Sequence, residues 1–70
     1  MEIRQVYYAL EIAKQNSFSK AARKLYITQP AITHQIKALE EELQVQLFDR
    51  TPQGVTLTQE GEKFCRYGEK

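Results

Sequence analysis

Three uncharged polar side chains, Gln29, Thr33 and His34, lie close together near the middle of this 70-residue chain. The amide of Gln29 offers a hydrogen-bond donor beside an acceptor, Thr33 offers a hydroxyl that does both, and His34 offers ring nitrogens of either kind. Lys37 follows within one helical turn and adds a positive charge. These residue types suit recognition of a polar surface, and they need a scaffold that presents them together.

The rest of the inventory argues against catalysis. The chain has one histidine and one cysteine, with no cluster of metal ligands and no glycine-rich phosphate loop, so we expect neither an enzyme nor a metal site. No apolar run approaches the roughly 18 residues of a membrane span. The first ten residues lack the basic head and apolar block of a secretory signal. Cys65 has no partner for an internal disulfide, which fits a reducing cytoplasm.

A net charge of +1 hides an uneven distribution of charge along the chain. Residues 1–37 contain six basic and two acidic side chains, whereas residues 38–70 contain four basic and seven acidic ones. The N-terminal half is therefore the part that would attract a polyanion such as nucleic acid. Splits of this kind also arise by chance on many protein surfaces.

Helical periodicity predicts two helices before the polar patch. Over residues 3–14, an apolar stripe at the spacing of a buried helix face predicts a first helix with its inner side formed by Ile3, Val6, Tyr7, Leu10 and Ala13. A second helix over residues 18–25 would bury Phe18, Ala21, Ala22 and Leu25. The paired alanines would let another helix cross at close range.

The polar patch lies on a predicted third helix. Thr28 is a suitable N-cap, and Pro30 is tolerated in the first turn, where its missing N–H costs nothing. At about 100° per residue, one narrow arc collects Ile32, Ile36, Leu39 and Leu43. Pro30, Thr33, His34 and Lys37 fall on the other side. The predicted order is a short helix, a tight turn and a second helix with a polar N-terminal half. This order is typical of a helix-turn-helix.

Two short alternating segments follow, at residues 47–50 and 55–57, with Pro52 and Gly54 between them. They predict a two-stranded hairpin that packs Leu47, Val55 and Leu57 inward. Thr58 then caps a fourth helix, which we expect to continue to the end of the chain without a terminating cap.

The ordered set of motifs resembles the N-terminal domain of LysR-type transcriptional regulators, and the resemblance covers essentially the whole chain. It is carried by "SFSKAARKLYITQPAITHQIKALEEEL", "QLFDR" and "GVTLTQEGE". The resemblance implies a mainly α winged helix-turn-helix with a three-helix core, a two-stranded β wing and a C-terminal linker helix. Residues 1–58 would form the DNA-binding domain, and residues 59–70 would begin the linker helix.

The family resemblance also implies a function. Members are mostly bacterial and bind double-stranded DNA as dimers, so we expect a cytoplasmic homodimer on an interrupted inverted repeat. The recognition helix, residues 28–43, would enter the major groove, with the wing, residues 47–57, near the minor groove and backbone. A small-molecule effector would bind a separate C-terminal domain absent from these residues, and no cofactor is expected here.

Within that framework the polar patch acquires a role in base recognition. Glutamine suits adenine, Thr33 can contact either base type, and small apolar surfaces pack on thymine methyl groups. Lys37 is expected to contact phosphate, with weaker contributions from Lys20, Arg23 and Lys24. The expected DNA contacts are therefore Thr28, Gln29, Pro30, Ala31, Thr33, His34, Lys37, Arg50 and Gln53.

Several positions leave alternatives open. Arg50 would lie near the DNA backbone or form a salt bridge with Glu41 or Glu42. Family members often have arginine at positions 34 and 53, so His34 and Gln53 imply lower phosphate affinity and a changed base preference. Position 44 is usually glycine, and Gln44 would cost about 1 kcal/mol if it keeps a left-handed conformation.

The fourth helix carries the expected dimer contacts. Gly61, Phe64, Cys65 and Gly68 share one side, which we expect to pack closely on another helix. That helix would belong to the same domain near Gly61 and to the second subunit near Gly68. Dimerisation is accordingly assigned to Phe64, Cys65 and Gly68. The main alternative function is a winged-helix protein–protein interaction module, in which the recognition helix should instead expose apolar anchors.

Overall fold

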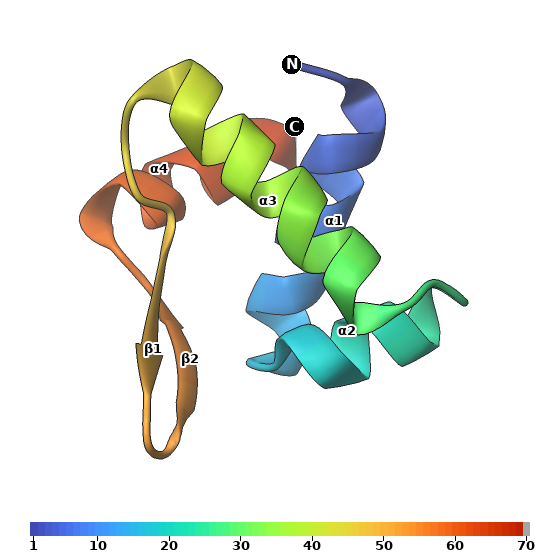
Figure 1. The fold of residues 1–70 in the computed structure, drawn as a ribbon. Coiled ribbons are helices and arrows are strands. Elements are labelled where there is room, and N and C mark those ends of the chain that lie inside the picture. Colours follow the sequence, from blue (N-terminus) through green and yellow to red (C-terminus); the bar gives the residue numbers. More distant parts are fainter. Residues whose placement is uncertain (70) are drawn as a thin grey trace.

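A computed structural model describes residues 1–69 of the chain as four helices and one β-hairpin (Figure 1). Three helices cross one another to form the core, the hairpin extends beside them, and the last helix lies behind. The elements in chain order are α1 (Ile3–Gln15), α2 (Phe18–Lys24), α3 (Gln29–Leu43), β1 (Phe48–Thr51), β2 (Gly54–Leu57) and α4 (Gln59–Gly68). This arrangement confirms the predicted winged helix-turn-helix.

The core lies where α1, α2 and α3 meet the base of the hairpin. Its fully buried large side chains are Ile12, Ile32, Ile36, Leu39 and Leu47. Ala21 and Ala22 are also buried, so α2 approaches both neighbouring helices closely, as their small size predicts. The predicted inner faces of α2 and α3 are therefore confirmed.

The predicted inner face of α1 was wrong for Ile3 and Tyr7, although Ala13 packs against the core as expected. Ala9 and Ile12 are fully buried, together with the polar Gln5, whereas Ile3 and Tyr7 remain 72% and 60% exposed. Apolar residues surround most of this helix, so periodicity alone does not choose between two stripes whose centres lie roughly a third of a turn apart. The core takes the stripe of Gln5, Ala9 and Ile12, since α1 packs against both α2 and α3.

Each of the first three helices ends in a left-handed residue or is followed closely by one. Asn16 and Gln44 directly cap α1 and α3 with φ of 55° and 57°, and Tyr26 in the turn after α2 has φ of 60°. The left-handed conformation expected at position 44 is therefore kept by a glutamine. These sharp ends redirect the chain and set the angle between α2 and α3.

The wing is a two-stranded antiparallel sheet in which Phe48 pairs with Leu57 and Thr51 pairs with Gly54. Each strand differs from its predicted bounds by one residue at one or both ends, and Leu47 is buried just before β1. Thr58 caps α4 by accepting a hydrogen bond from the N–H of Gly61 at 2.9 Å. Within the described residues α4 ends at Gly68, earlier than expected, and Lys70 lies outside them.

Candidate DNA-binding interface

The first turn of α3 is built as its sequence indicates. Thr28 is the N-cap, and its hydroxyl accepts a hydrogen bond from the N–H of Ala31 at 3.2 Å. Pro30 lies within the first turn, where the helix loses no hydrogen bond. The helix therefore begins abruptly and presents its N-terminal residues to solvent.

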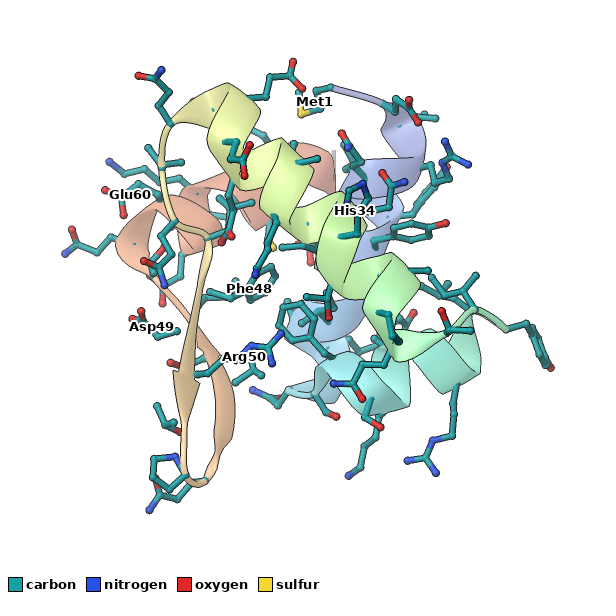
Figure 2. All side chains as sticks on the ribbon, viewed as in Figure 1. Met1, His34, Phe48, Asp49, Arg50 and Glu60 are labelled. Atoms are coloured by element: carbon teal, nitrogen blue, oxygen red, sulfur yellow. The ribbon has the colours of Figure 1, made fainter. Side chains whose placement is uncertain are left out.

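The predicted contact residues of α3 lie on its outer side and at its exposed N-terminal end. Ile32, Ile36 and Leu39 hold the inner side. The outer side carries Pro30, Thr33, His34 and Lys37, while Thr28, Gln29 and Ala31 stand at the N-terminal end of the helix. All of these outer residues are exposed except Thr33, which is half-buried. Figure 2 shows His34 on the ribbon of α3. The structure thus presents one continuous polar surface carrying hydrogen-bonding groups and one cation.

A buried amide pair holds α3 against α1. Gln5 is only 7% exposed, and its side-chain N–H group donates to the backbone oxygen of Gln35 at 3.4 Å and to its side-chain oxygen at 3.2 Å. The side-chain oxygen of Gln5 accepts from the N–H of Glu2 at 3.1 Å. Sequence reasoning missed Gln5, although its spacing with Ala9 and Ile12 follows one helix face. This polar link helps to fix α3 within an otherwise apolar contact.

Arg50 reaches from the wing toward the helices (Figure 2). Its guanidinium carbon lies 4.2 Å from the ring centroid of Phe18, which in turn contacts the ring of Phe48 edge to face at 5.7 Å. The guanidinium is therefore held by a cation–π contact at the start of α2. Arg50 nevertheless remains exposed to solvent.

The alternative role expected of Arg50, a salt bridge to Glu41 or Glu42, was wrong. Glu42 instead pairs with the N-terminal ammonium group at 2.6 Å. The other ion pair recorded among residues 1–69 joins Arg4 and Glu2. Among residues 1–69 no salt bridge between Arg50 and a carboxylate is recorded.

A cleft separates α3 from β1, and cations and carboxylates both line it. Thr33 and Lys37 come from α3 and Arg50 from β1, while Glu40 and Asp49 contribute negative charge. At the far end of the wing, the turn is closed by the hydroxyl of Thr51, which donates to the carbonyl oxygen of Gly54 at 2.8 Å. Gln53 is exposed in that turn. The structure thus brings the wing cation Arg50 next to the α3 surface and leaves Gln53 at the tip.

The three residues assigned to dimerisation face their own chain. Cys65 is 7% exposed, and Phe64 is partly buried against the core. Burial raises the pKa of the Cys65 thiol, and the negative charge of Glu69 adds to that rise. A side chain added at Gly68 would meet Cγ1 of Val6 on α1 at 3.0 Å.

Large apolar side chains elsewhere on this part of the molecule are exposed. Ile3 and Tyr7 of α1 and Tyr67 of α4 have exposed fractions of 60% or more. A shallow apolar hollow lies between α1 and α4, lined in part by Ile3, Tyr7 and Leu10. The dimer role of Phe64, Cys65 and Gly68 stays a prediction.

Residues 1–69 hold no group of three or more histidine, cysteine, aspartate or glutamate side chains arranged to bind a metal ion. None of the described helices has both the length and the apolar character needed to cross a membrane.

Comparison with known proteins identifies relatives of this fold and sequence. Residues 3–62 match the family described as bacterial regulatory helix-turn-helix protein, lysR family. The chain is 50% identical over 64 residues to the HTH-type transcriptional regulator ClcR of Pseudomonas putida, covering 91% of this chain and 22% of the relative. It is 44% identical over 70 residues to BenM of Acinetobacter baylyi, covering all of this chain and 23% of the relative.

Solved structures with a similar fold come from the same family of regulators. The BenM DNA-binding domain in complex with catB site 1 DNA has a TM-score of 0.95 and 43% identity, covering 99% of this chain and 77% of that chain. Full-length CbnR in complex with its target DNA has a TM-score of 0.93 and 38% identity, covering 99% of this chain and 24% of that chain. The chain spans about a quarter of the length of such full regulators. By sequence and by fold, it belongs to the LysR family of bacterial helix-turn-helix regulatory proteins.

Proposed function

We propose that the chain binds double-stranded DNA in a sequence-specific manner as the reading domain of a transcriptional regulator. The observation that carries this proposal is the exposed polar surface on the N-terminal half of α3, presented opposite a fully buried apolar face. A helix of this kind fits the major groove with its N-terminal residues nearest the base edges. The DNA complexes of the similar BenM and CbnR domains support the proposal.

In this proposal the uncharged side chains of α3 select bases. Gln29 pairs with adenine through its amide, and Thr33 donates to or accepts from a base beside it. Pro30 and Ala31 pack on thymine methyl groups, and His34 donates to guanine or to phosphate. Since hydrogen bonds and shape carry this selection, it does not depend on the small net charge of the chain.

Cations around that surface supply the contacts to phosphate. Lys37 lies one turn beyond the base-reading residues, and Arg50 lies across the cleft on the wing. The cation–π contact with Phe18 restricts the guanidinium of Arg50 before DNA binds, so Arg50 loses less conformational entropy on binding. Gln53 at the wing tip would contact the minor groove or backbone, more weakly than an arginine.

The regulator is proposed to act in the cytoplasm as a homodimer on an interrupted inverted repeat, with a small-molecule effector bound by a domain outside these residues. The exposed Ile3, Tyr7 and Tyr67 support a contact between subunits across α1 and α4, because burying them would remove apolar surface from water. No enzymatic role is proposed, since the named relatives are transcriptional regulators.

A protein–protein interaction module is the weaker alternative. Such a module would expose large apolar anchors on its recognition helix. The exposed large apolar residues are instead Met1, Ile3, Tyr7, Tyr26, Val45 and Tyr67, all outside α3.

The proposal is tested by selecting duplexes from a random library with the purified chain, both as produced and fused to a dimerising segment. The expected result is enrichment of one short sequence, arranged as an interrupted inverted repeat for the fused form. Failure of both forms to enrich any sequence would contradict sequence-specific binding.

A further inference from the structure

A carboxylate of the recognition helix holds the start of the wing. Oε2 of Glu40 accepts hydrogen bonds from the backbone N–H groups of Leu47 at 2.7 Å and of Phe48 at 3.3 Å. These two amides form the point where the chain enters β1. Charged acceptors make stronger hydrogen bonds than neutral ones, so the single carboxylate ties α3 firmly to the first strand.

A second contact holds the other strand. Asn16 follows α1, and its backbone oxygen accepts from the N–H of Val55 at 3.3 Å. Its side-chain nitrogen donates to the backbone oxygen of the same residue at 3.3 Å. Asn16 thus pairs with the outer edge of β2 as a single residue of a third strand would.

The two contacts act on opposite strands and come from different helices. An isolated two-stranded hairpin is marginally stable at best in water, so its orientation depends on such attachments. Rotation of the wing about its base would break the bonds of Glu40 or those of Asn16. Between these attachments lies Arg50, whose distance from the α3 surface is set by the orientation of the wing.

We infer that Glu40 and Asn16 are positioning residues for DNA recognition, which fix the wing so that Arg50 and Gln53 meet the same duplex that α3 reads. This inference rests on the proposed function. It concerns residues that need not touch DNA themselves. Glu40 lies beside the cation Lys37 on the binding surface, where its negative charge repels phosphate. In this inference, the positioning of the wing by Glu40 contributes more to DNA binding than that repulsion costs.

Substitutions that remove a negative charge from α3 distinguish this inference from a purely electrostatic effect, because the two predict opposite changes in DNA affinity at Glu40. Glu41 is an exposed neighbour on the same helix, so Glu41→Ala removes an equal charge and should strengthen DNA binding slightly. Glu40→Ala should instead weaken binding to the duplex selected by the unmodified chain, by roughly ten-fold, because hydrogen bonds to a charged group are lost. Glu40→Gln keeps an acceptor oxygen and should restore most of that loss.

A double-substitution cycle tests whether Glu40 acts through the wing. If Glu40 positions Arg50, then Arg50→Ala should cost clearly less affinity in the Glu40→Ala background than in the unmodified chain. Asn16→Gly preserves the left-handed backbone but removes the side-chain donor, and it should reduce the cost of Arg50→Ala in the same direction. Equal costs in all three backgrounds, or a gain of affinity in Glu40→Ala, would overturn the inference.

Two further measurements distinguish a loss of folding from a loss of DNA affinity. Thermal unfolding shows whether each variant is folded at the assay temperature. If Glu40→Ala is not folded, the cycle of Asn16→Gly with Arg50→Ala carries the test. Amide hydrogen exchange without DNA should show faster exchange at Leu47 and Phe48 in Glu40→Ala than in Glu41→Ala. Unchanged exchange there would overturn the inference, whereas an unmodified chain that selects no duplex would contradict the proposed function instead.

Discussion

At the scale of single residues, the proposed interface assigns base selection and phosphate contact to different side chains. Gln29, Thr33 and His34 are the hydrogen-bonding side chains of the α3 surface, whereas Lys37 is its cation. Phosphate contacts are independent of base sequence and depend on released counterions, whereas base contacts carry sequence information. Substitutions in the two groups should therefore have different signatures.

Lys37→Ala should weaken binding to every duplex alike. We expect the slope of log affinity against log salt to become shallower by about one, because one phosphate contact is lost. Titration of a selected and a scrambled duplex at several salt concentrations measures both quantities. Lys63→Ala is the matched control, because Lys63 is an exposed lysine on α4, outside the proposed interface. Equal effects of the two substitutions would contradict a phosphate contact at Lys37.

The residues of this surface were predictable because two local signals agree. The Thr28 cap and Pro30 mark where α3 begins, and the apolar arc of Ile32, Ile36 and Leu39 fixes which side faces outward. The partners of Arg50 and Glu40 were not predictable from sequence. Those contacts join residues that are distant along the chain, and they depend on how the wing packs against the helices.

At the scale of elements, apolar spacing predicted the inner faces of α2 and α3 but failed for α1. A helix with one apolar stripe has one way to pack, whereas α1 is apolar around most of its circumference. Its most regular stripe is only partly buried, and Ile3 and Tyr7 on that stripe remain exposed in the single chain. Sequence spacing cannot distinguish a face buried within the domain from a face available to a second subunit.

The two glycines of α4 should differ sharply in their tolerance of substitution. A methyl group at Gly61 would lie 2.0 Å from the backbone oxygen of Leu47, so α4 or the chain entering the wing must shift. Gly61→Ala should therefore reduce the free energy of unfolding by about 2 kcal/mol, despite the better helix propensity of alanine.

Gly68→Ala serves as the comparison for Gly61→Ala. At position 68 the nearest atom is a methyl carbon of Val6 at 3.0 Å, which can move by a small rotation of its side chain. The free energy of unfolding should change by less than about 0.5 kcal/mol. Urea unfolding of both variants measures the difference, and similar losses at the two positions would contradict the packing described for Gly61.

At the scale of the whole molecule, a small domain combines a fixed reading helix, an attached wing and an apolar surface on α1 and α4. A chain of about 70 residues buries a limited core, which makes association with a second copy an effective way to remove exposed apolar surface. A symmetric dimer would place two α3 surfaces on two half-sites. Each residue of the surface should then contact the equivalent base pair in both halves of a symmetric operator.

The most direct test of this account repeats the library selection with Gln29→Ala in the dimer-fused chain and compares it with the unmodified chain. The account predicts the same interrupted inverted repeat with the same spacing. It also predicts a relaxed preference at one or two base pairs, found at the equivalent place in both half-sites. An unchanged base preference at every position, or loss of the repeat in a folded variant, would contradict the claim that the polar surface of α3 reads DNA sequence.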